Sequence, residues 1–239
     1  MEHRFQPTAA LLDKVSGPLH GLIIASPSNP TGTMLGRAEL RDLVAYCADR
    51  GLRLVSDEIY HGITYREPAV SALELTDQAI VINSFSKYFS MTGWRLGWMV
   101  VPEDLHRPIE CLAQNFFISA PTLSQIAGLA AFDCRDELDG NVARYARNRA
   151  LLLERLPAAG FDRLAPADGA FYIYADVGRL TNDSDDFCRQ ILSETGVAIT
   201  PGLDFDPDRG GRFVRFSFAG AEPEMAEAAE RLRDWMAGR

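Results

Sequence analysis

Cysteine and histidine are scarce in this sequence, and neither is clustered. The four cysteines are Cys47, Cys111, Cys134 and Cys188, and no Cys-x-x-Cys pair is among them. The four histidines are equally dispersed. Metal sites use closely spaced ligands, so we expect no metal centre. Unpaired cysteines are typical of a reducing compartment.

Positive charge is also in deficit, because 24 Lys and Arg face 33 Asp and Glu for a net charge of −9. Proteins that bind a phosphate backbone normally carry a basic face, so the composition argues against a nucleic-acid partner. No apolar run reaches the length of a membrane span, and the opening MEHRFQPTAALLDK lacks the apolar core of a signal peptide. We therefore expect a cytoplasmic protein without a membrane partner.

A Gly-x-Gly-x-x-Gly turn is missing after every predicted strand, which disfavours a Rossmann dehydrogenase. What is present suits a globular protein with one large domain or a large and a small one: 47% hydrophobic and 24% charged residues over 239 positions. Periodicity predicts strands over 20–26, 52–56, 79–83, 96–101, 170–177, 197–200 and 212–218. It predicts helices over 9–15, 38–50, 104–117, 122–134, 139–156, 184–195 and 223–237.

Three polar clusters follow the first three long strands. They begin at Ser26, Asp57 and Ser84, spaced 57 − 26 = 31 and 84 − 57 = 27 residues apart. Such spacing is typical of βαβ units, whose parallel strands end at one rim of the sheet. Open α/β sheets bind their ligands at that rim.

The tract NSFSKYFSMTGWRLGW, residues 83–98, carries the most informative of these clusters. It places Lys87 just after a strand end, with Ser84 and Ser86 before it and Arg95 beyond it. An amine nucleophile forms Schiff bases with carbonyl groups, and a hydroxyl with a guanidinium can hold an anion beside it. Taken singly, each residue also fits a plainer role: a surface charge, a helix cap or an edge arginine.

Two other strand ends and one later strand offer further polar groups. SNPTG places Asn29 in a proline turn, and DEIY places Asp57 and Tyr60 at the next strand end; the plainer interpretations are an ordinary turn and a helix cap. In the strand 213–218, alternation puts Arg215 on the opposite face from its apolar neighbours. An arginine in that position is often only the solvent side of a strand.

The Ser-x-Ser-Lys and Met-Thr-Gly-Trp-Arg-Leu-Gly pattern closely resembles the cofactor-lysine segment of class I/II aminotransferases, which are pyridoxal phosphate (PLP) enzymes of the aspartate aminotransferase fold, type I. SNPTG, SDEIYHGITY and VRFSFA resemble three more motifs of this family, in family order. The resemblance implies an α/β fold with a mainly parallel mixed sheet in a PLP-binding large domain, residues 1–140. An interdomain helix and a small carboxyl-terminal α/β domain would occupy residues 141–239.

The resemblance also implies a role for each motif residue in transamination between an L-amino acid and a 2-oxo acid by a homodimer. Lys87 would hold PLP as a Schiff base and move the proton. Asp57 would pair with the ring nitrogen, and Asn29 and Tyr60 would bind the ring oxygen. Ser84 and Arg95, helped by Ser86, would bind the phosphate, and Arg215, with Asn29, would bind the substrate carboxylate. His61 has no assigned role.

The resemblance departs from the family at the amino terminus, where a typical member has about a third more chain. That part supplies sheet strands, a Gly-rich phosphate loop and dimer contacts, so we expect an uncovered sheet edge and apolar surface here. Two alternatives stay open: a silent scaffold or interaction protein, and a same-fold PLP lyase. The stretch 115–128 contains no arginine, which argues against a strict dicarboxylate enzyme.

Overall fold

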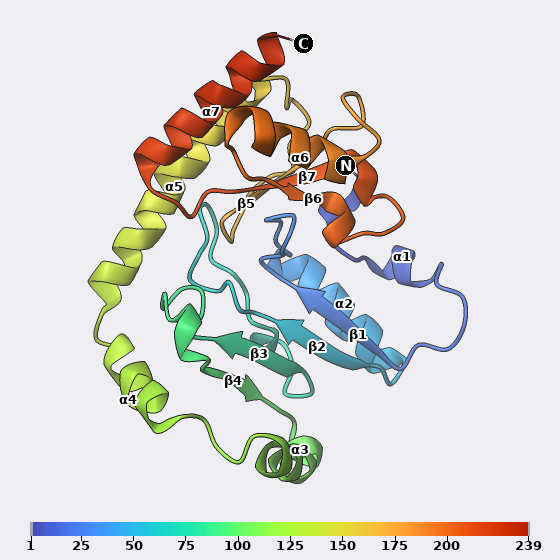
Figure 1. The fold of residues 1–239 in the computed structure, drawn as a ribbon. Coiled ribbons are helices and arrows are strands. Elements are labelled where there is room, and N and C mark those ends of the chain that lie inside the picture. The colour runs from blue at the N-terminus through green and yellow to red at the C-terminus, as the bar shows by residue number, and fades with distance from the viewer. Residues whose placement is uncertain (1, 239) are drawn as a thin grey trace. The chain divides into compact units, whose positions relative to one another are not determined.

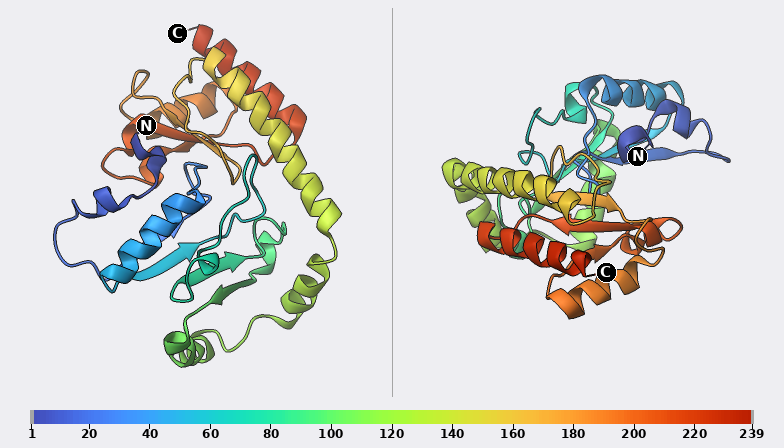
Figure 2. Two further views of the ribbon diagram at one scale, coloured as in Figure 1. Left: turned by 180° about the vertical axis from the view of Figure 1, so that it is seen from behind. Right: turned by 90° about the horizontal axis from the view of Figure 1, so that it is seen from above.

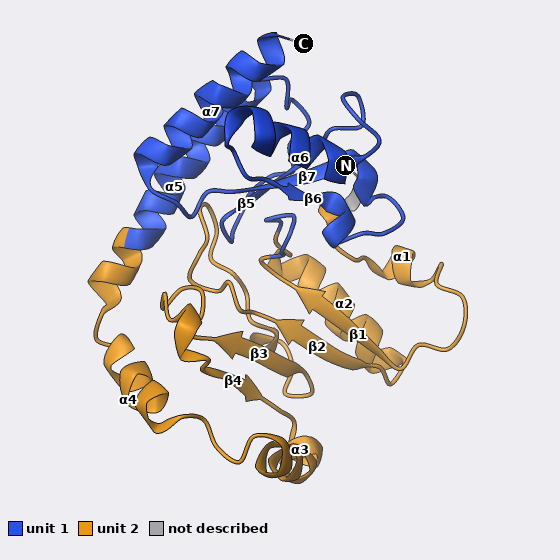
Figure 3. Ribbon diagram, in the orientation of Figure 1, with its two compact units in different colours: residues 1, 28–33, 141–239 blue, residues 2–27, 34–140 orange. Residues whose placement is uncertain are grey.

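The structure, a computed structural model, describes residues 2–238 and divides into two compact units (Figure 3). Unit 2 holds residues 2–27 and 34–140, and unit 1 holds residues 28–33 and 141–238. Residues 28–33, which carry SNPTG, thus group with the carboxyl-terminal part of the chain. Within residues 2–238, no helix has the length and apolar character needed to cross a membrane.

Unit 2 is built on a four-stranded sheet in the order β1-β2-β3-β4 (Figure 1). Strands β1, β2 and β3 run parallel, and β4 is antiparallel to β3. This is the mixed, mainly parallel sheet that the family resemblance implies. The elements are η1 Glu2–Phe5, α1 Ala9–Leu12, β1 Gly21–Ala25, α2 Arg37–Asp49, β2 Arg53–Asp57, η2 Ala72–Glu74, β3 Ile80–Ser84, η3 Thr92–Trp94, β4 Gly97–Val100, α3 Glu103–Phe116 and α4 Thr122–Ala131.

Helix α2 covers one face of this sheet (Figures 1 and 2). Its apolar residues Leu40, Leu43 and Cys47 recur at helical spacing and are buried against Ile24 and Leu54 of the sheet. The helix begins where the Glu39 side chain accepts the Gly36 N–H at 2.7 Å. It ends before Gly51, whose φ of +63° is the left-handed conformation that glycine adopts most easily.

The opposite face of the same sheet leaves apolar side chains exposed. Ile23 of β1 is 76% exposed although its neighbour Ile24 is 3% exposed, because successive strand residues point to opposite faces. Ile82 and Met99, which pair across β3 and β4, are also exposed. The expected uncovered apolar surface is therefore found in unit 2.

Unit 1 contains an antiparallel three-stranded sheet in the order β5-β7-β6, with helices packed around it. Its elements are β5 Tyr172–Asp176, α6 Ser184–Thr195, β6 Thr200–Pro201, η4 Gly202–Asp204, η5 Gly210–Arg212, β7 Phe213–Ser217 and α7 Glu222–Ala237, together with most of α5 Arg135–Ala158. Figures 1 and 2 show α7 lying along α5, and ion pairs Arg147–Glu222 and Arg155–Glu230 join the two helices.

The predicted elements are confirmed with small shifts at their ends. Helix α6 has the predicted bounds because the Asp183 side chain accepts N–H groups of its first turn and Gly196, at φ +72°, ends it. Helix α5 begins four residues before the predicted start at 139 and continues through Pro157, past the predicted end at 156, and the left-handed Gly160 follows. Strand β6 is shorter than the predicted 197–200 and is shifted along the chain, since it comprises Thr200 and Pro201, which pair with β7.

Candidate active site

The ends of the parallel strands come together as the spacing predicted. Asp57, the last residue of β2, pairs in register with Ala25 of β1 and Ile82 of β3. The Ser26 N–H donates to the Asp57 carbonyl at 3.2 Å, which extends the ladder past the end of β1. The Asp57 carboxylate accepts the Ile59 N–H at 3.1 Å and so shapes the turn that follows.

Lys87 lies in the turn after β3, close to Tyr60 in the turn after β2. Its Nζ is 5.5 Å from the centroid of the Tyr60 ring, and Tyr60 itself is buried. Phe85 and Met91 flank Lys87 and are buried together with Ala131 of α4. This apolar packing fixes both ends of the turn, so the amine is presented from a rigid support.

The two serines before Lys87 form a hydroxyl pair at the end of β3. Ser84 Oγ lies 3.0 Å from Ser86 Oγ and accepts the Ser86 N–H at 3.0 Å. It also lies 3.1 Å from the carbonyl oxygen of Leu96, the residue after Arg95. A hydroxyl has one hydrogen, so Ser84 can donate to only one of these oxygens at a time.

Arg95 connects η3 to β4 in the left-handed conformation, with φ of +52°. Its Nη1 donates to the Thr92 carbonyl at 2.9 Å, and its side chain is exposed. Within residues 2–238, Arg95 makes no ion pair. The Arg95 guanidinium therefore keeps donors for an anion.

Asn29 and Arg215 meet within unit 1, although 186 residues separate them. Arg215 Nη1 donates to Asn29 Oδ1 at 2.7 Å. The predicted alternation along β7 is confirmed, since Val214 and Phe216 are buried on the other face. These two residues, predicted from separate motifs, form one polar pair.

The segment 28–33 is attached to unit 1 through Gly32. The Gly32 carbonyl accepts the N–H groups of Asp168 and Gly169 at 2.8 and 3.0 Å. Gly32 has φ of +67°, and a Cβ there would lie 2.6 Å from the Tyr172 carbonyl oxygen. Only glycine fits this close approach, which gives the Thr-Gly of SNPTG a packing role.

Known proteins match this chain over nearly its whole length. The family model described as aminotransferase class I and II matches residues 2–232. The chain belongs to this family. Valine–pyruvate aminotransferase of Mycobacterium tuberculosis is 52% identical over 237 residues, which are 98% of this chain and 61% of that protein.

Solved structures confirm the fold of the aminotransferase chain. A crystal structure of an aminotransferase from Mycobacterium tuberculosis superposes with a TM-score of 0.95 at 51% identity and covers 99% of this chain and 62% of that one. A Thermus thermophilus aspartate aminotransferase, a double mutant, superposes with a TM-score of 0.88 at 30% identity, covering 98% and 61%. The chain thus spans about three fifths of the length of the relatives it matches.

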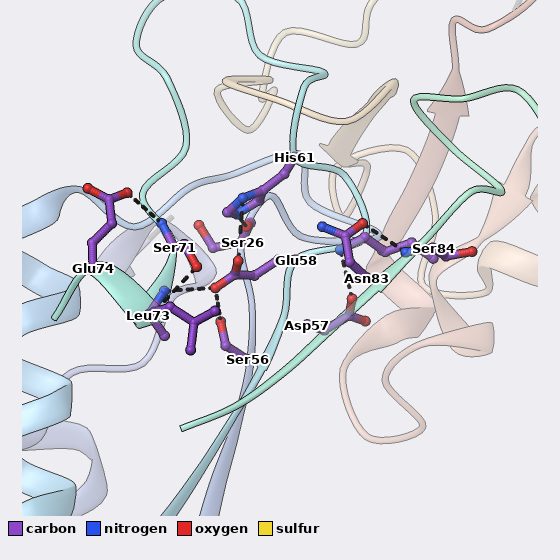
Figure 4. A network of polar contacts seen from close by, with 12 residues as sticks. Ser26, Ser56, Asp57, Glu58, His61, Ser71, Leu73, Glu74, Asn83 and Ser84 are labelled. Carbon is purple, nitrogen blue, oxygen red and sulfur yellow. Dashed lines mark hydrogen bonds and ion pairs between the residues drawn. The ribbon is translucent and has the colours of Figure 1, made fainter. Parts of the chain in front are cut away.

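A buried network beside Asp57 was not predicted from the aminotransferase motifs (Figure 4). The Glu58 side chain is 4% exposed and accepts the Ser56 hydroxyl at 3.0 Å and the Ala72 N–H at 2.8 Å. His61 Nδ1 lies 3.5 Å from Glu58, and its Nε2 lies 3.1 Å from the Ser26 carbonyl oxygen. His61, to which the motifs assign no role, thus connects the ends of β1 and β2.

Three neighbours of Arg215 were also missed. Arg215 Nη2 donates to Thr200 Oγ1 at 3.2 Å, and its guanidinium carbon lies 4.3 and 4.8 Å from the ring centroids of Tyr172 and Phe205. Strand alternation marked the face of Arg215, but no local pattern shows which side chains from β5 and from the loop after η4 reach it.

The donor set at the sheet end of unit 2 fits PLP. The Lys87 amine suits an aldehyde, the Asp57 carboxylate a pyridine nitrogen and the buried Tyr60 phenol a ring oxygen. The hydroxyls of Ser84 and Ser86 suit a phosphate together with Arg95, which makes no ion pair within residues 2–238. Within residues 2–238, no three His, Cys, Asp or Glu side chains gather where they could hold a metal ion.

A hollow of about 550 Å³ lies elsewhere in unit 2, at the amino-terminal ends of the strands. Its lining includes His20, Cys47, Arg53 and Gln78 but none of the predicted site residues. The candidate site is defined by the chemical groups at the carboxyl-terminal ends of the strands, not by this hollow.

Proposed function

We propose that this chain acts as a PLP-dependent aminotransferase that moves an amino group between an L-amino acid and a 2-oxo acid. The observation that carries the proposal is the position of Lys87, whose amine lies beside the Tyr60 ring in a turn fixed by buried Phe85 and Met91. The family assignment supports the same activity.

Unit 2 would hold the cofactor. When bound, PLP supplies an aldehyde that condenses with amines and an electron-poor ring that stabilises negative charge at the substrate Cα. Asp57 would keep the ring nitrogen protonated, and Tyr60 would donate to the ring oxygen, a role that we propose for Asn29 as well. The hydroxyls of Ser84 and Ser86 and the guanidinium of Arg95 would bind the phosphate.

Lys87 would have two roles, one in binding the cofactor and one in proton transfer. Its amine would hold the cofactor covalently, and Lys87 would also act as general base and acid, taking the proton from the substrate Cα and delivering it two bonds away, on the other side of the substrate nitrogen. Positioned general acid–base groups of this kind contribute roughly 100- to 10,000-fold to a rate.

Arg215 would bind the substrate carboxylate, with Asn29 beside it. Within the described chain, Arg215 makes no ion pair, and a guanidinium pairs with a carboxylate through two parallel hydrogen bonds. Holding the carboxylate fixes which Cα bond is oriented for cleavage.

We propose valine and pyruvate as the first substrate pair to test, on the basis of the Mycobacterium tuberculosis relative at 52% identity. An amino acid with one carboxylate also agrees with the lack of arginine between residues 115 and 128. A dicarboxylate substrate would need a second cation.

We also propose that the large, PLP-binding domain comprises residues 1–140, that the interdomain helix and small domain follow over 141–239, and that the protein is a cytoplasmic homodimer. The two compact units support the domain proposal, except that residues 28–33 group with unit 1. Four cysteines without a disulfide support a reducing compartment.

The test is simple because the sequence has just two lysines, Lys14 and Lys87. The purified chain is mixed with PLP, its absorbance is recorded before and after borohydride reduction, and the modified lysine is mapped. We expect label on Lys87, loss of the absorbance band in Lys87→Ala, and retention of the band in Lys14→Ala.

Equal label on both lysines, or none, would contradict the proposal and favour a silent scaffold. Where Lys87 is labelled, valine and pyruvate are supplied and the products are measured. Alanine and 2-oxoisovalerate in equal amounts indicate transamination, whereas free ammonia would indicate a same-fold lyase.

A further inference from the structure

The guanidinium of Arg215 contacts two aromatic rings and two hydrogen-bond acceptors. The guanidinium carbon of Arg215 lies 4.3 Å from the ring centroid of Tyr172 in β5. It lies 4.8 Å from the ring centroid of Phe205, in the loop after η4. Both contacts are within the distance at which an aromatic face attracts a cation. Two rings restrict the tilt of the planar guanidinium.

Rotation within the plane is restricted by hydrogen bonds. Nη1 donates to Asn29 Oδ1 at 2.7 Å and Nη2 donates to Thr200 Oγ1 at 3.2 Å. The third nitrogen, Nε, is buried and has no hydrogen-bond partner within residues 2–238. The Nε side of the guanidinium is therefore closed to a ligand.

What remains is the edge formed by Nη1 and Nη2. Each of these nitrogens carries two hydrogens and donates one of them within unit 1, so one hydrogen is left on each. Aromatic rings attract a cation without neutralising it, and no described carboxylate pairs with Arg215. The charge is held in place but stays available.

We propose that Tyr172 and Phe205 are positioning residues that, with Thr200, fix the Nη1–Nη2 edge of Arg215 as a rigid clamp for a carboxylate. The inference rests on the proposed function, because it concerns how Arg215 binds the carboxylate of the amino acid or 2-oxo acid. Phe205 is the member best suited to a test, because it comes from a loop and is only partly buried.

The clamp can be tested without PLP or turnover. The full chain is labelled with ¹⁵N-arginine and titrated with sodium isovalerate, an unreactive monocarboxylate, while the Arg215 side-chain signal, assigned by its loss in Arg215→Lys, is followed by NMR. Isovaleramide, which has the same shape and no charge, is the ligand control.

Two variants of Phe205 distinguish the effect of its aromatic ring from the effect of its size. Phe205→Leu keeps an apolar side chain but removes the ring, and we expect isovalerate to bind about 3- to 30-fold more weakly. Phe205→Tyr keeps the ring and should bind as the wild type does. Phe213→Leu is the matched control, because Phe213 is stacked on Tyr174 at 5.0 Å rather than on Arg215.

Each outcome decides. If the wild type binds isovalerate, Arg215→Lys does not, and Phe205→Leu binds equally well, the clamp is wrong while the carboxylate role of Arg215 stands. If Phe213→Leu weakens binding as much as Phe205→Leu, the effect is general packing and the clamp is again wrong. If isovalerate never shifts the wild-type signal, both the clamp and the proposed carboxylate role fail.

Discussion

Asp176 and Arg215 show two ways in which unit 1 accommodates a charge among apolar residues. The Asp176 carboxylate receives Arg212 at 2.7 Å and Arg163 at 3.0 Å, together with the Gly178 N–H at 3.0 Å. Arg215 receives aromatic rings and neutral oxygens instead. The paired charge of Asp176 contributes to the structure, whereas the charge of Arg215, which has no counter-ion within the described chain, is suited to binding a ligand.

Asp176→Asn should lower the free energy of unfolding by about 1 to 3 kcal/mol at neutral pH, because it removes charge-assisted hydrogen bonds from a carboxylate that is 4% exposed. The arginines left behind are partly exposed, so water can solvate them. Thermal or urea unfolding measures the loss, and Asp162→Asn is the control, since its pair with Arg179 is exposed.

The same variant has a predictable pH dependence. Burial raises the pKa of Asp176, but the hydrogen bonds from Arg212 and Gly178 and the charges of Arg212 and Arg163 outweigh it and lower the pKa below the ordinary value. A lowered pKa stabilises the fold fully above the unfolded-state pKa of about 3.9, and that stability is lost as the pH falls further. The difference between wild type and variant should therefore shrink below about pH 4. A constant difference would show that the charge is not responsible.

The turn after β2 packs against the turn after β3. The Tyr88 ring, next to Lys87, lies directly over Gly62, which has φ of +89°. The Tyr88 hydroxyl donates to Asp139 at 2.6 Å, and burial, together with that carboxylate, raises the pKa of Tyr88 to about 12. The turn that carries Tyr60 and the turn that carries Lys87 are thus in van der Waals contact.

Gly62→Ala should disturb both turns, because its Cβ would lie 2.6 Å from the Tyr88 ring. The left-handed conformation alone costs roughly 1 to 2 kcal/mol for a residue with a side chain. Gly17→Ala is the matched control, since Gly17 has φ of +94° and no atom within 4 Å of an added Cβ. We expect Gly62→Ala to lower the melting temperature more than Gly17→Ala and to weaken PLP binding, measured by absorbance titration. Equal losses would mean that the contact with Tyr88 is unimportant.

Among the residues that the structure describes, most of the exposed large apolar side chains belong to unit 2. The exposed side chains lie on the uncovered sheet face, on β4, and along α3 and α4: Ile23, Ile82, Trp98, Met99, Val100, Leu112, Phe116, Phe117, Ile118, Leu123, Ile126, Leu129 and Phe132. Surfaces of this kind mark sites of protein association, and the sheet ends in β1 on one side.

Ile23→Lys should therefore reduce concentration-dependent self-association and leave the fold intact, because this side chain is 76% exposed. Ile24→Lys, one residue away on the buried face, should unfold unit 2, because it places a charge in the core under α2. Sedimentation velocity and circular dichroism of the two variants provide the measurements. Unchanged association of Ile23→Lys would show that this face is not involved.

Much of this fold and of its candidate site could be predicted from local patterns. Short apolar runs gave the strands, turn and cap residues gave the helix ends, and the regular spacing of Ser26, Asp57 and Ser84 gave one common sheet edge, because parallel strands end on the same side. Element ends were less predictable, as Pro157 shows, because a helix end depends on packing as well as on local preference.

The sequence by itself determined the chemical groups: the amine of Lys87, the carboxylate of Asp57, the serine hydroxyls and the side of β7 that bears Arg215. Only the tertiary structure decided their partners. Asn29 joins Arg215 across 186 residues, Phe205 reaches it from a loop, and Glu58 is satisfied by the Ala72 N–H. Periodicity records which face a side chain takes, whereas contacts between distant segments depend on how whole elements pack, and no local pattern encodes that.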